Sequence, residues 1–423
     1  MTPPPRRAAR MTSSSASVLV VGGGVVGRAC ALALQRDGWQ VALLDPDAGG
    51  VASSWGNAGH IATEQVQPLA SLATLRSAPR RWHAFGGPLD LREPLHRLPW
   101  VMRYLRACVP SRFDAGRTAL RGLLADALPA WRRLAQSINA PELLHEQGHW
   151  VCWESASGAR RGEAAWRGAD IGTTTLSALG DARRATLQSH LAAPIAGGIA
   201  FDGTAQIADL PALAQRLGAA FAQAGGIQRS LRVQSLRREG RRVHAIADDG
   251  TRLDADLVLV CAGVRSGALM DALGVRAPLV AERGYHLHWA AHDWPALPPV
   301  VFEDRSMILT RFAGGLRAAG FVEYAGIDTP PDLRKWARLR EHVEQLGIPV
   351  RGEPVPWFGA RPTLPDYLPA LGRSECFDNL AYAFGHQHLG LTLAAISGEL
   401  LADLCAGRPG AVASAAFDLG RFA

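Results

Sequence analysis

The stretch VLVVGGGVVGRACALALQRDGWQVALLD, residues 18–45, decides the fold. Val18–Val21 predicts a short buried strand, and the glycines after it open a segment with apolar residues at helical spacing. Gly38 ends this predicted helix, and Val41–Leu44 predicts a second strand that leads into Asp45. The stretch is therefore a strand–helix–strand unit of about 30 residues.

The glycines of this unit have the spacing of a dinucleotide fingerprint. In Gly22-x-Gly24-x-x-Gly27 they permit a tight turn, close approach to a pyrophosphate and close packing of helix on sheet. The helix N-terminus adds unpaired N–H groups, and Asp45 can accept hydrogen bonds from a ribose. The predicted contacts of this unit are Gly22, Gly24, Val25, Val26, Gly27 and Asp45. The fingerprint alone does not distinguish NAD from FAD.

Three further segments favour a flavin. SSWGNAGH (residues 53–60) is a loop of small residues that can run beside a flat ring, and VLVCAG (residues 258–263) ends a second strand. GHQHLGLT (residues 385–392) starts the last helix, whose N-terminus could stabilise the negative charge of a reduced flavin. The further predicted cofactor contacts are Ser53, Ser54, Asn57, Ala58, Gly59, His60, Val233, Ala262, Gly263, Gly359, Arg361, Gly385, His386, His388, Leu389, Gly390, Leu391 and Thr392.

The remaining pattern indicates an α/β protein whose cofactor domain is interrupted twice. Residues 69–138 have helical periodicity and are interpreted as part of a cap, and alternating strands return in residues 277–350. The predicted units are a disordered tail (1–17), an FAD-binding domain (18–75, 207–276 and 351–423) and a mixed α/β substrate domain (76–206 and 277–350).

Composition narrows the function classes. The chain of 423 residues is 48% hydrophobic, has a net charge of +7, and carries three of its arginines in the tail. Its basic residues are otherwise scattered among acidic ones, so no nucleic-acid partner is expected. The six cysteines form no CxxC pair, which favours a reducing, cytoplasmic location. No transmembrane run is found and no basic amphipathic stretch demands a bilayer, so any membrane association at the inner face would be peripheral.

Several segments resemble the D-amino-acid oxidase/dehydrogenase superfamily of FAD enzymes, over most of residues 18–407. GNAGHI in the serine-rich loop, RGYHL (residues 283–287) and GARPTLPDYLPALGR (residues 359–373) are similar to segments of bacterial D-amino-acid dehydrogenases. GHQHLGLT is similar to the version in D-hydroxyproline dehydrogenases. The resemblance implies a Rossmann-type FAD domain interleaved with a substrate domain, and non-covalent FAD. Asp45 stands where the family more often has glutamate.

The resemblance also implies the residues of the chemistry. Arg361 matches the arginine that binds the substrate carboxylate, a role that suits the bidentate guanidinium; the alternative is a structural salt bridge. Tyr285 and His286 should point to opposite faces of one strand, so at most one enters the pocket. His60 and His388 are further candidates for accepting a proton or hydrogen-bonding the substrate. His386-x-His388 and His286-x-His288 lack a carboxylate or thiolate at ligand spacing, so no metal is expected.

The expected reaction is oxidation of a D-amino or cyclic D-imino acid to its imine by hydride transfer to flavin N5, with cis-4-hydroxy-D-proline as the best candidate. The alternatives are a broad D-amino-acid dehydrogenase, a glycine/sarcosine-type oxidase, an RNA-modifying flavoprotein and a non-catalytic nucleotide-binding module. The electron acceptor, such as a quinone or an electron carrier, is left open by the sequence.

Overall fold

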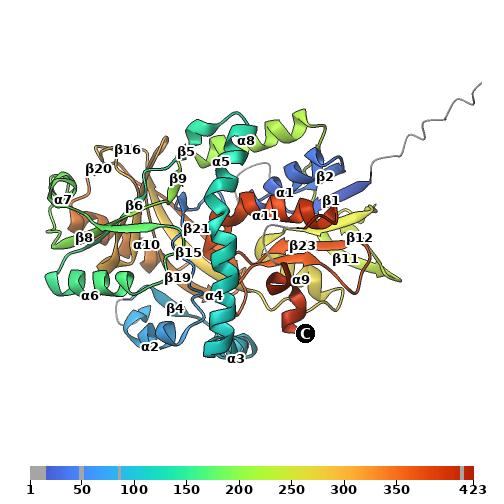
Figure 1. The fold of residues 1–423 in the computed structure, drawn as a ribbon, viewed down its shortest axis with the longest axis horizontal. Coiled ribbons are helices and arrows are strands. Elements are labelled where there is room, and N and C mark those ends of the chain that lie inside the picture. Colours follow the sequence, from blue (N-terminus) through green and yellow to red (C-terminus); the bar gives the residue numbers. More distant parts are fainter. Residues whose placement is uncertain (1–15, 47–51, 84–86, 410–413) are drawn as a thin grey trace, which may run out of the picture.

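Two sheets dominate the molecule, and helices cover both (Figure 1). The computed structural model describes residues 16–46, 52–83, 87–409 and 414–423. Of the predicted tail, residues 1–15 lie outside the described residues, while Ser17 already begins the first strand. The α/β class predicted from the sequence is confirmed.

The first sheet contains the fingerprint unit. Its order is β10-β2-β1-β14-β23-β22, parallel except for the last pair. Val20 pairs with Leu43 on one side and Leu259 on the other, and all three are buried, as in parallel strands covered on both faces. The strands are β10 (Ile227–Arg229), β2 (Gln40–Leu44), β1 (Ser17–Val21), β14 (Leu257–Val260), β23 (Leu380–Phe384) and β22 (Ala370–Arg373).

Helices α1 (Val25–Arg36) and α11 (Gly390–Cys405) pack closely on this sheet. Gly398 makes the close approach possible, because a Cβ there would lie 2.9 Å from the carbonyl oxygen of Ala29. Each helix follows a parallel strand, so both N-termini lie at the carboxyl edge of the sheet (Figure 1). The two ends of the sequence thus meet at one place, the usual ligand position in open α/β sheets.

The second sheet has nine strands, in the order β21-β15-β19-β18-β17-β6-β8-β7, with β4 paired to β19. One face is covered by α10 (Leu333–Leu346), which buries Leu339, Val343 and Leu346 as its periodicity predicts. The strands are β21 (Val355–Thr363), β15 (Val280–Trp289), β19 (Gly315–Ala325), β18 (Met307–Phe312), β17 (Val300–Phe302), β6 (His149–Trp153), β8 (Gly197–Asp202), β7 (Thr175–Ala178) and β4 (Leu89–Leu91).

Smaller elements complete the described parts of the chain. The small sheets are β11 (Val233–Glu239), β12 (Arg242–Ala247) and β13 (Arg252–Leu253); β3 (His60–Ile61), β9 (Ala205–Ile207) and β5 (Leu144–His145); and β16 (Ala291–His292) with β20 (Val350–Arg351). The other helices are α2 (Leu72–Arg81), α3 (Leu98–Ala107), α4 (Pro110–Ala125), α5 (Ala127–Ser137), α6 (Ala156–Arg167), α7 (Asp181–Gln188), α8 (Leu210–Gln223) and α9 (Ser266–Asp271). Short 3₁₀ turns are η2 (Pro94–Arg97), η3 (Pro141–Leu143), η4 (Gly263–Arg265), η5 (Glu303–Arg305), η6 (Gln387–Leu389), η7 (Ser414–Phe417) and η8 (Leu419–Phe422).

The packing of α4 and α5 differs from the cap interpretation of residues 69–138. Their predicted apolar face is buried, but against α11 and the first sheet. The Trp131 indole donates to the carbonyl oxygens of Leu391 (3.0 Å) and Thr392 (3.1 Å) in the first turn of α11. An apolar helix face packs on whichever core lies nearest, and periodicity alone cannot choose between two cores.

Strand β21 also departs from the predicted domain bounds. Residues 351–423 were assigned to the FAD-binding domain, yet β21 pairs with β15 along its whole length in the nine-stranded sheet. The chain therefore crosses back to the first sheet only after Thr363. The other bounds stay a prediction.

The stretch Gln387–Cys405 is long and apolar enough to cross a membrane, judged by length and composition alone. Most of it is buried between α1, α5 and the first sheet, as expected for the core helix of a globular protein.

Candidate functional site at the junction of the two sheets

The fingerprint turn brings two strand ends into contact. Gly22 has a φ of +106°, and a Cβ there would lie 2.5 Å from the carbonyl oxygen of Cys261 and 2.8 Å from the Cα of Ala262. A Cβ on Gly27 would overlap the carbonyl oxygen of Gly22. Only glycine meets both demands, so the turn and the helix can approach as the fingerprint requires.

The first turn of α1 is arranged as an anion cradle. Gly24 is the N-cap residue and contributes no side chain, and the N–H of Val25 donates to Ser54 Oγ at 3.1 Å. The carboxylate of Asp45, at the end of β2, accepts a hydrogen bond from the N–H of Gly23. A helix N-terminus with an acidic residue beside it fits a pyrophosphate followed by a ribose.

The small-residue loop is tied to the nine-stranded sheet. Ser53 Oγ donates to the carbonyl oxygen of Ala360 on β21 at 2.5 Å, and Asn57 Oδ1 accepts from the N–H of Gly59 at 2.8 Å. Arg317, which the sequence analysis missed, donates to the carbonyl oxygens of Asn57 and Trp55. Burial lowers the pKa of Arg317 to about 10, so it stays charged and holds the loop.

The start of α11 contacts the same loop region. Thr392 Oγ1 accepts from the N–H of Ala62 at 2.9 Å, and His388 Nε2 lies 2.5 Å from Gln65 Oε1. His386 pairs with Thr363 at the end of β21, and its Nε2 lies 2.9 Å from Ser397 Oγ. The last helix, the flavin-type loop and β21 therefore converge on one junction.

Arg361 lies at this junction in an incomplete ion pair. Its Nη1 is 3.1 Å from Glu282 Oε1, and the side chains are 27% and 1% exposed. The other Glu282 oxygen accepts from Thr363 Oγ1 (3.1 Å) and Tyr367 OH (3.0 Å). Burial raises the pKa of Tyr367, so its hydroxyl remains a donor. Both oxygens of Glu282 are thus bonded, whereas Arg361 has further N–H groups to offer.

A glycine pair forms the floor beside Arg361. Gly284 of β15 and Gly359 of β21 lie directly opposite each other, and a Cβ on either would overlap a neighbour: the guanidinium of Arg361 over Gly284, or the indole of Trp357 over Gly359. Trp357 stacks on His286, with ring centroids 4.9 Å apart and planes at 14°. The guanidinium and the indole therefore cover the glycine pair, and only glycine leaves them room to do so.

Tyr285 and His286 do point to opposite faces, as predicted. His286 Nδ1 lies 3.0 Å from the carbonyl oxygen of Gly56, so this nitrogen carries the hydrogen and Nε2 is left as an acceptor. Tyr285 instead lies under α10, where its hydroxyl donates to Glu323 and accepts from Arg283 at 2.9 Å. The predicted role of Tyr285 at the pocket is not supported by this placement.

His60 joins a buried group that sequence spacing could not indicate. His60 Nε2 is 3.4 Å and His149 Nε2 is 4.0 Å from Glu64 Oε1, and the three ligand atoms lie within 4.8 Å of one another. His60 lies on β3 and Glu64 follows that strand, whereas His149 begins β6, far away in the sequence. Two histidines and a carboxylate are residue types that zinc accepts, and the expectation of no metal stays a prediction.

The buried histidines are neutral at physiological pH. Burial lowers the pKa of His388 to about 4, of His386 and His149 to about 3, and of His286 to about 2. Imidazoles with pKa values this low accept hydrogen bonds near pH 7 but are weak bases toward an ammonium group.

The other predicted contacts take less central positions. Ala262 is the N-cap of η4, and Gly263, with a φ of +56°, is its first residue. Gly385 has a φ of +78°, where only glycine avoids strain, and directly precedes His386. Val233 begins β11 and packs against the core beside β1.

Together, the fold and the site define a protein that holds an extended dinucleotide at the carboxyl edge of a Rossmann-type sheet, with a second sheet over its far end. Residues 17–404 match the family described as FAD dependent oxidoreductase, abbreviated DAO, and the chain belongs to this family. FAD fits the residues at this edge: the glycine cradle would take the pyrophosphate, Asp45 the ribose, and the start of α11 the flavin end.

The relatives of the chain carry related names. It is 30% identical over 409 residues to a D-amino-acid oxidase of Bradyrhizobium diazoefficiens (94% and 96% of the two chains) and 32% identical over 404 residues to D-amino acid dehydrogenase 2 of Pseudomonas aeruginosa (91% and 94%). Its fold is similar to that of glycine oxidase from Geobacillus kaustophilus, with a TM-score of 0.69, 22% identity and coverage of 96% and 99%.

Proposed function

We propose that this FAD-dependent oxidoreductase oxidises a D-amino or cyclic D-imino acid to its imine, with cis-4-hydroxy-D-proline as the best candidate. The proposal rests on the ion pair of Arg361 with Glu282. The Arg361 side chain is partly exposed and has N–H groups to spare, whereas both oxygens of Glu282 already accept hydrogen bonds. FAD, when bound, supplies the acceptor for the hydride.

Arg361 would bind the substrate carboxylate. One N–H group of its guanidinium reaches Glu282, and this bond sets the direction of the remaining donors. A charge-assisted contact to a carboxylate is worth about 1.5–3 kcal/mol. Its place over Gly284 puts the guanidinium beside the loop that would border the flavin, which is where an amino acid must be oriented.

Trp357 and His286 would receive the ring of a cyclic substrate. Both lie on the same side of the sheet as Arg361, and the Trp357 indole covers Gly359 while the guanidinium covers Gly284. The edge of the Trp357–His286 stack would contact a pyrrolidine ring held by Arg361, and the Nε2 of His286 can accept a hydrogen bond from a ring hydroxyl. These two residues support a hydroxylated cyclic imino acid over an open-chain amino acid.

His388 is the best placed hydrogen-bonding group among the neutral histidines. It is buried between the start of α11 and Gln65, close enough to Arg361 and Glu282 for their charges to affect its pKa. A neutral His388 would accept a hydrogen bond from the amine of a substrate held by Arg361. His60, paired with Glu64, would offer a second hydrogen-bonding group.

The experiment is anaerobic flavin bleaching with a panel of substrates. Purified protein is mixed with cis-4-hydroxy-D-proline, D-proline, D-alanine and sarcosine, and the flavin absorbance is followed. We expect cis-4-hydroxy-D-proline to bleach the flavin with the highest second-order rate constant. A higher rate constant for D-alanine or sarcosine would instead select the broader dehydrogenase or oxidase, which the relatives' names favour.

We also propose that FAD is held without a covalent bond and that the enzyme works in the cytoplasm. Four of the six cysteines are buried, as expected for thiols kept reduced. Acid precipitation should release the flavin into the supernatant. Yellow colour retained in the washed pellet would contradict the non-covalent assignment.

A further inference from the structure

A row of large apolar side chains faces solvent along η2 and α3. Leu95 is 83% exposed, Leu98 54%, Met102 50%, Leu105 42% and Val109 47%. Leu98, Met102 and Leu105 form one stripe of α3 by their spacing of four and three residues. Leu95 on η2 and Val109, just before α4, flank this stripe, and we name the five residues the α3 ridge. A helix that only served the fold would turn such a stripe inward.

The inward face of α3 is already occupied. Trp100 and Tyr104 pack against a cluster containing Ala70, Ala107 and Tyr367, and the Tyr104 hydroxyl donates to the carbonyl oxygen of Leu69 at 2.9 Å. The helix therefore has an anchoring face as well as the α3 ridge. Folding does not require the side chains of the α3 ridge to face solvent. Contiguous exposed apolar patches usually mark a binding surface.

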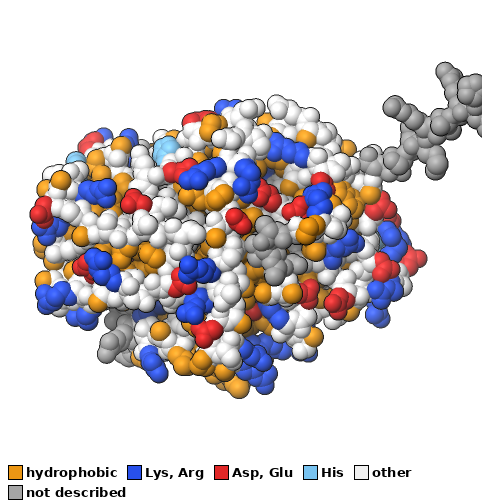
Figure 2. Space-filling model, in the orientation of Figure 1, with side chains coloured by type: hydrophobic (Ala, Val, Ile, Leu, Met, Phe, Trp, Pro, Cys, Tyr) orange, Lys and Arg blue, Asp and Glu red, His pale blue; other side chains and the backbone are white. Residues whose placement is uncertain are grey.

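The charge around the α3 ridge is mainly positive. Residues 94–113 carry Arg97, Arg103, Arg106 and Arg112; Glu93 and Asp114 adjoin them, and Arg97 pairs with Glu93 at 3.6 Å. Figure 2 shows basic side chains next to hydrophobic ones at the lower edge of the molecule, where α3 lies in Figure 1. A basic, amphipathic surface helix of this kind is typical of proteins that lie on a membrane. The sequence analysis interpreted this stretch as part of a cap and found no basic amphipathic helix in it.

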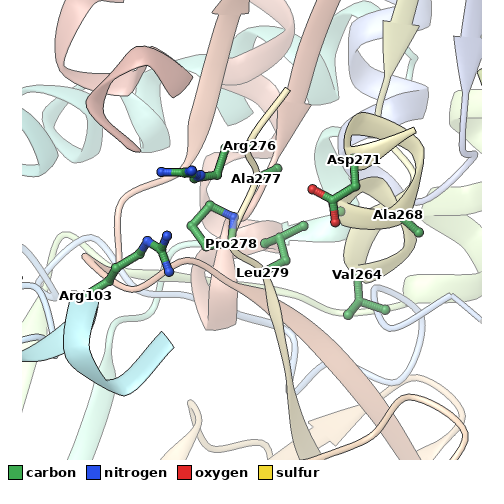
Figure 3. A pocket seen from close by; sticks show the side chains of 9 residues that line it. Arg103, Val264, Ala268, Asp271, Arg276, Ala277, Pro278 and Leu279 are labelled. Carbon is green, nitrogen blue, oxygen red and sulfur yellow. The ribbon is translucent and has the colours of Figure 1, made fainter. Parts of the chain in front are cut away.

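A cavity next to the helix extends the positive surface. Arg103 of α3 and Arg276 lie on the same side of an opening of about 300 Å³ whose other walls include Val264, Pro278 and Leu279 (Figure 3). Arg276 Nη1 also donates to the carbonyl oxygen of Phe422 at 3.3 Å. The two guanidinium groups would bind the phosphate of a phospholipid, and the apolar walls would contact its acyl chains. Asp271 lies on the opposite wall.

We propose that the protein docks on an anionic phospholipid bilayer through α3. The α3 ridge would enter the boundary between headgroups and acyl chains, and the arginines of residues 94–113 would contact lipid phosphates. The combination of exposed apolar side chains with an excess of basic neighbours favours this occupant.

Vesicle sedimentation of the FAD-loaded protein tests the proposal. Vesicles of phosphatidylcholine containing 30% phosphatidylglycerol should carry the protein into the pellet at low salt, and vesicles of phosphatidylcholine alone should bind at least about tenfold less. Binding should weaken as salt is added. Protein that stays in the supernatant with both vesicle types would overturn the proposal.

Two sets of variants locate the surface. Leu98→Glu with Met102→Glu should reduce binding to anionic vesicles at least about tenfold, and Arg106→Gln with Arg112→Gln should reduce both binding and its dependence on salt. Ile227→Glu is the matched control, since Ile227 is 55% exposed on β10 at the edge of the first sheet. Equal losses in the ridge variant and the control would contradict docking through α3. A change of oligomeric state in the ridge variant with unchanged vesicle binding would assign the ridge to a second copy of the chain instead.

Discussion

Two ion pairs on one strand show how the same chemistry can serve stability or function. On one face of β15, Arg283 pairs with Glu323 at 3.2 Å, and both side chains are fully buried. On the other face, Glu282 pairs with Arg361 at 3.1 Å, and the arginine is 27% exposed. Adjacent residues of a strand point to opposite faces, so one strand supplies a closed network under α10 and an open site at the flavin edge.

The closed pair is completed by the only lysine of the chain. Lys335 Nζ lies 3.3 Å from Glu323 and 2.8 Å from Asp90, and it is fully buried. Every charge in this network has a partner, and Arg283, Glu323 and Lys335 are all buried, so an anion from solvent cannot reach them, although Arg283 Nε has no partner of its own. The open pair differs because the Arg361 side chain is partly exposed. Exposure, rather than the pairing itself, distinguishes a binding arginine from a structural one.

The largest expected effect comes from breaking the closed pair. Glu323→Gln removes the charge that Arg283 and Lys335 share and should lower the free energy of unfolding by about 3–5 kcal/mol. Glu353→Gln, in the exposed pair with Arg340, should cost about 0–1 kcal/mol. Urea unfolding followed by circular dichroism measures both. Equal midpoints for the two variants would refute the distinction.

Acid should destabilise the junction through its neutral histidines. Burial holds the pKa of His149 and His386 at about 3 and of His388 at about 4, below the ordinary 6.5. Because the folded pKa is depressed, this stability is fully present above pH 6.5 and is lost as pH falls toward the folded values. Each histidine contributes a slope of about 1.4 kcal/mol per pH unit.

The measurement for this prediction is the melting temperature between pH 7.5 and pH 5. His386→Gln should flatten the fall, whereas His145→Gln, at an exposed position, should leave the wild-type curve unchanged. An identical acid slope in all three proteins would show that the buried imidazoles do not set it.

Arg361→Lys tests the open pair. A lysine keeps the charge but loses the bidentate fork, so kcat/KM should fall at least about tenfold while FAD stays bound and the melting temperature changes little. Arg340→Lys in the exposed surface pair is the control and should leave kcat/KM unchanged. Wild-type kinetics in Arg361→Lys would return Arg361 to a structural role.

Trp357→Ala should give the smallest effect. Loss of the plate beside the glycine pair would reduce the preference for cis-4-hydroxy-D-proline over D-alanine, by at most about tenfold if an aromatic contact contributes about 0.5–1.5 kcal/mol. The ratio of the two kcat/KM values reports this change. A ratio equal to that of the wild type would remove Trp357 from the substrate site.

The sequence was most informative where signals are local. The fingerprint turn and the strands around it follow from residue spacing, and β1, α1 and β2 lie where the spacing predicts them. The family's motifs also placed Arg361 beside the loop at residues 53–60.

What the sequence could not predict depends on strand pairing. Glu282 and Trp357 enter the site only through the register of β15 with β21, and Glu64 meets His149 across 85 positions of sequence. The alternation of side chains along a strand predicts that Tyr285 and His286 lie on opposite faces. It cannot predict that α10 covers the face that carries Tyr285. The α3 ridge was overlooked because a solvent-facing stripe and a core-facing stripe have the same periodicity.

The most direct test of an open Arg361 is a titration of the bound flavin's absorbance with pyrrole-2-carboxylate and with the corresponding amide. The wild-type protein should bind the acid at least about tenfold more tightly than the amide, and Arg361→Lys should lose most of that preference. The same preference in both proteins would mean that some other group receives the carboxylate, and the account of the open pair would fail.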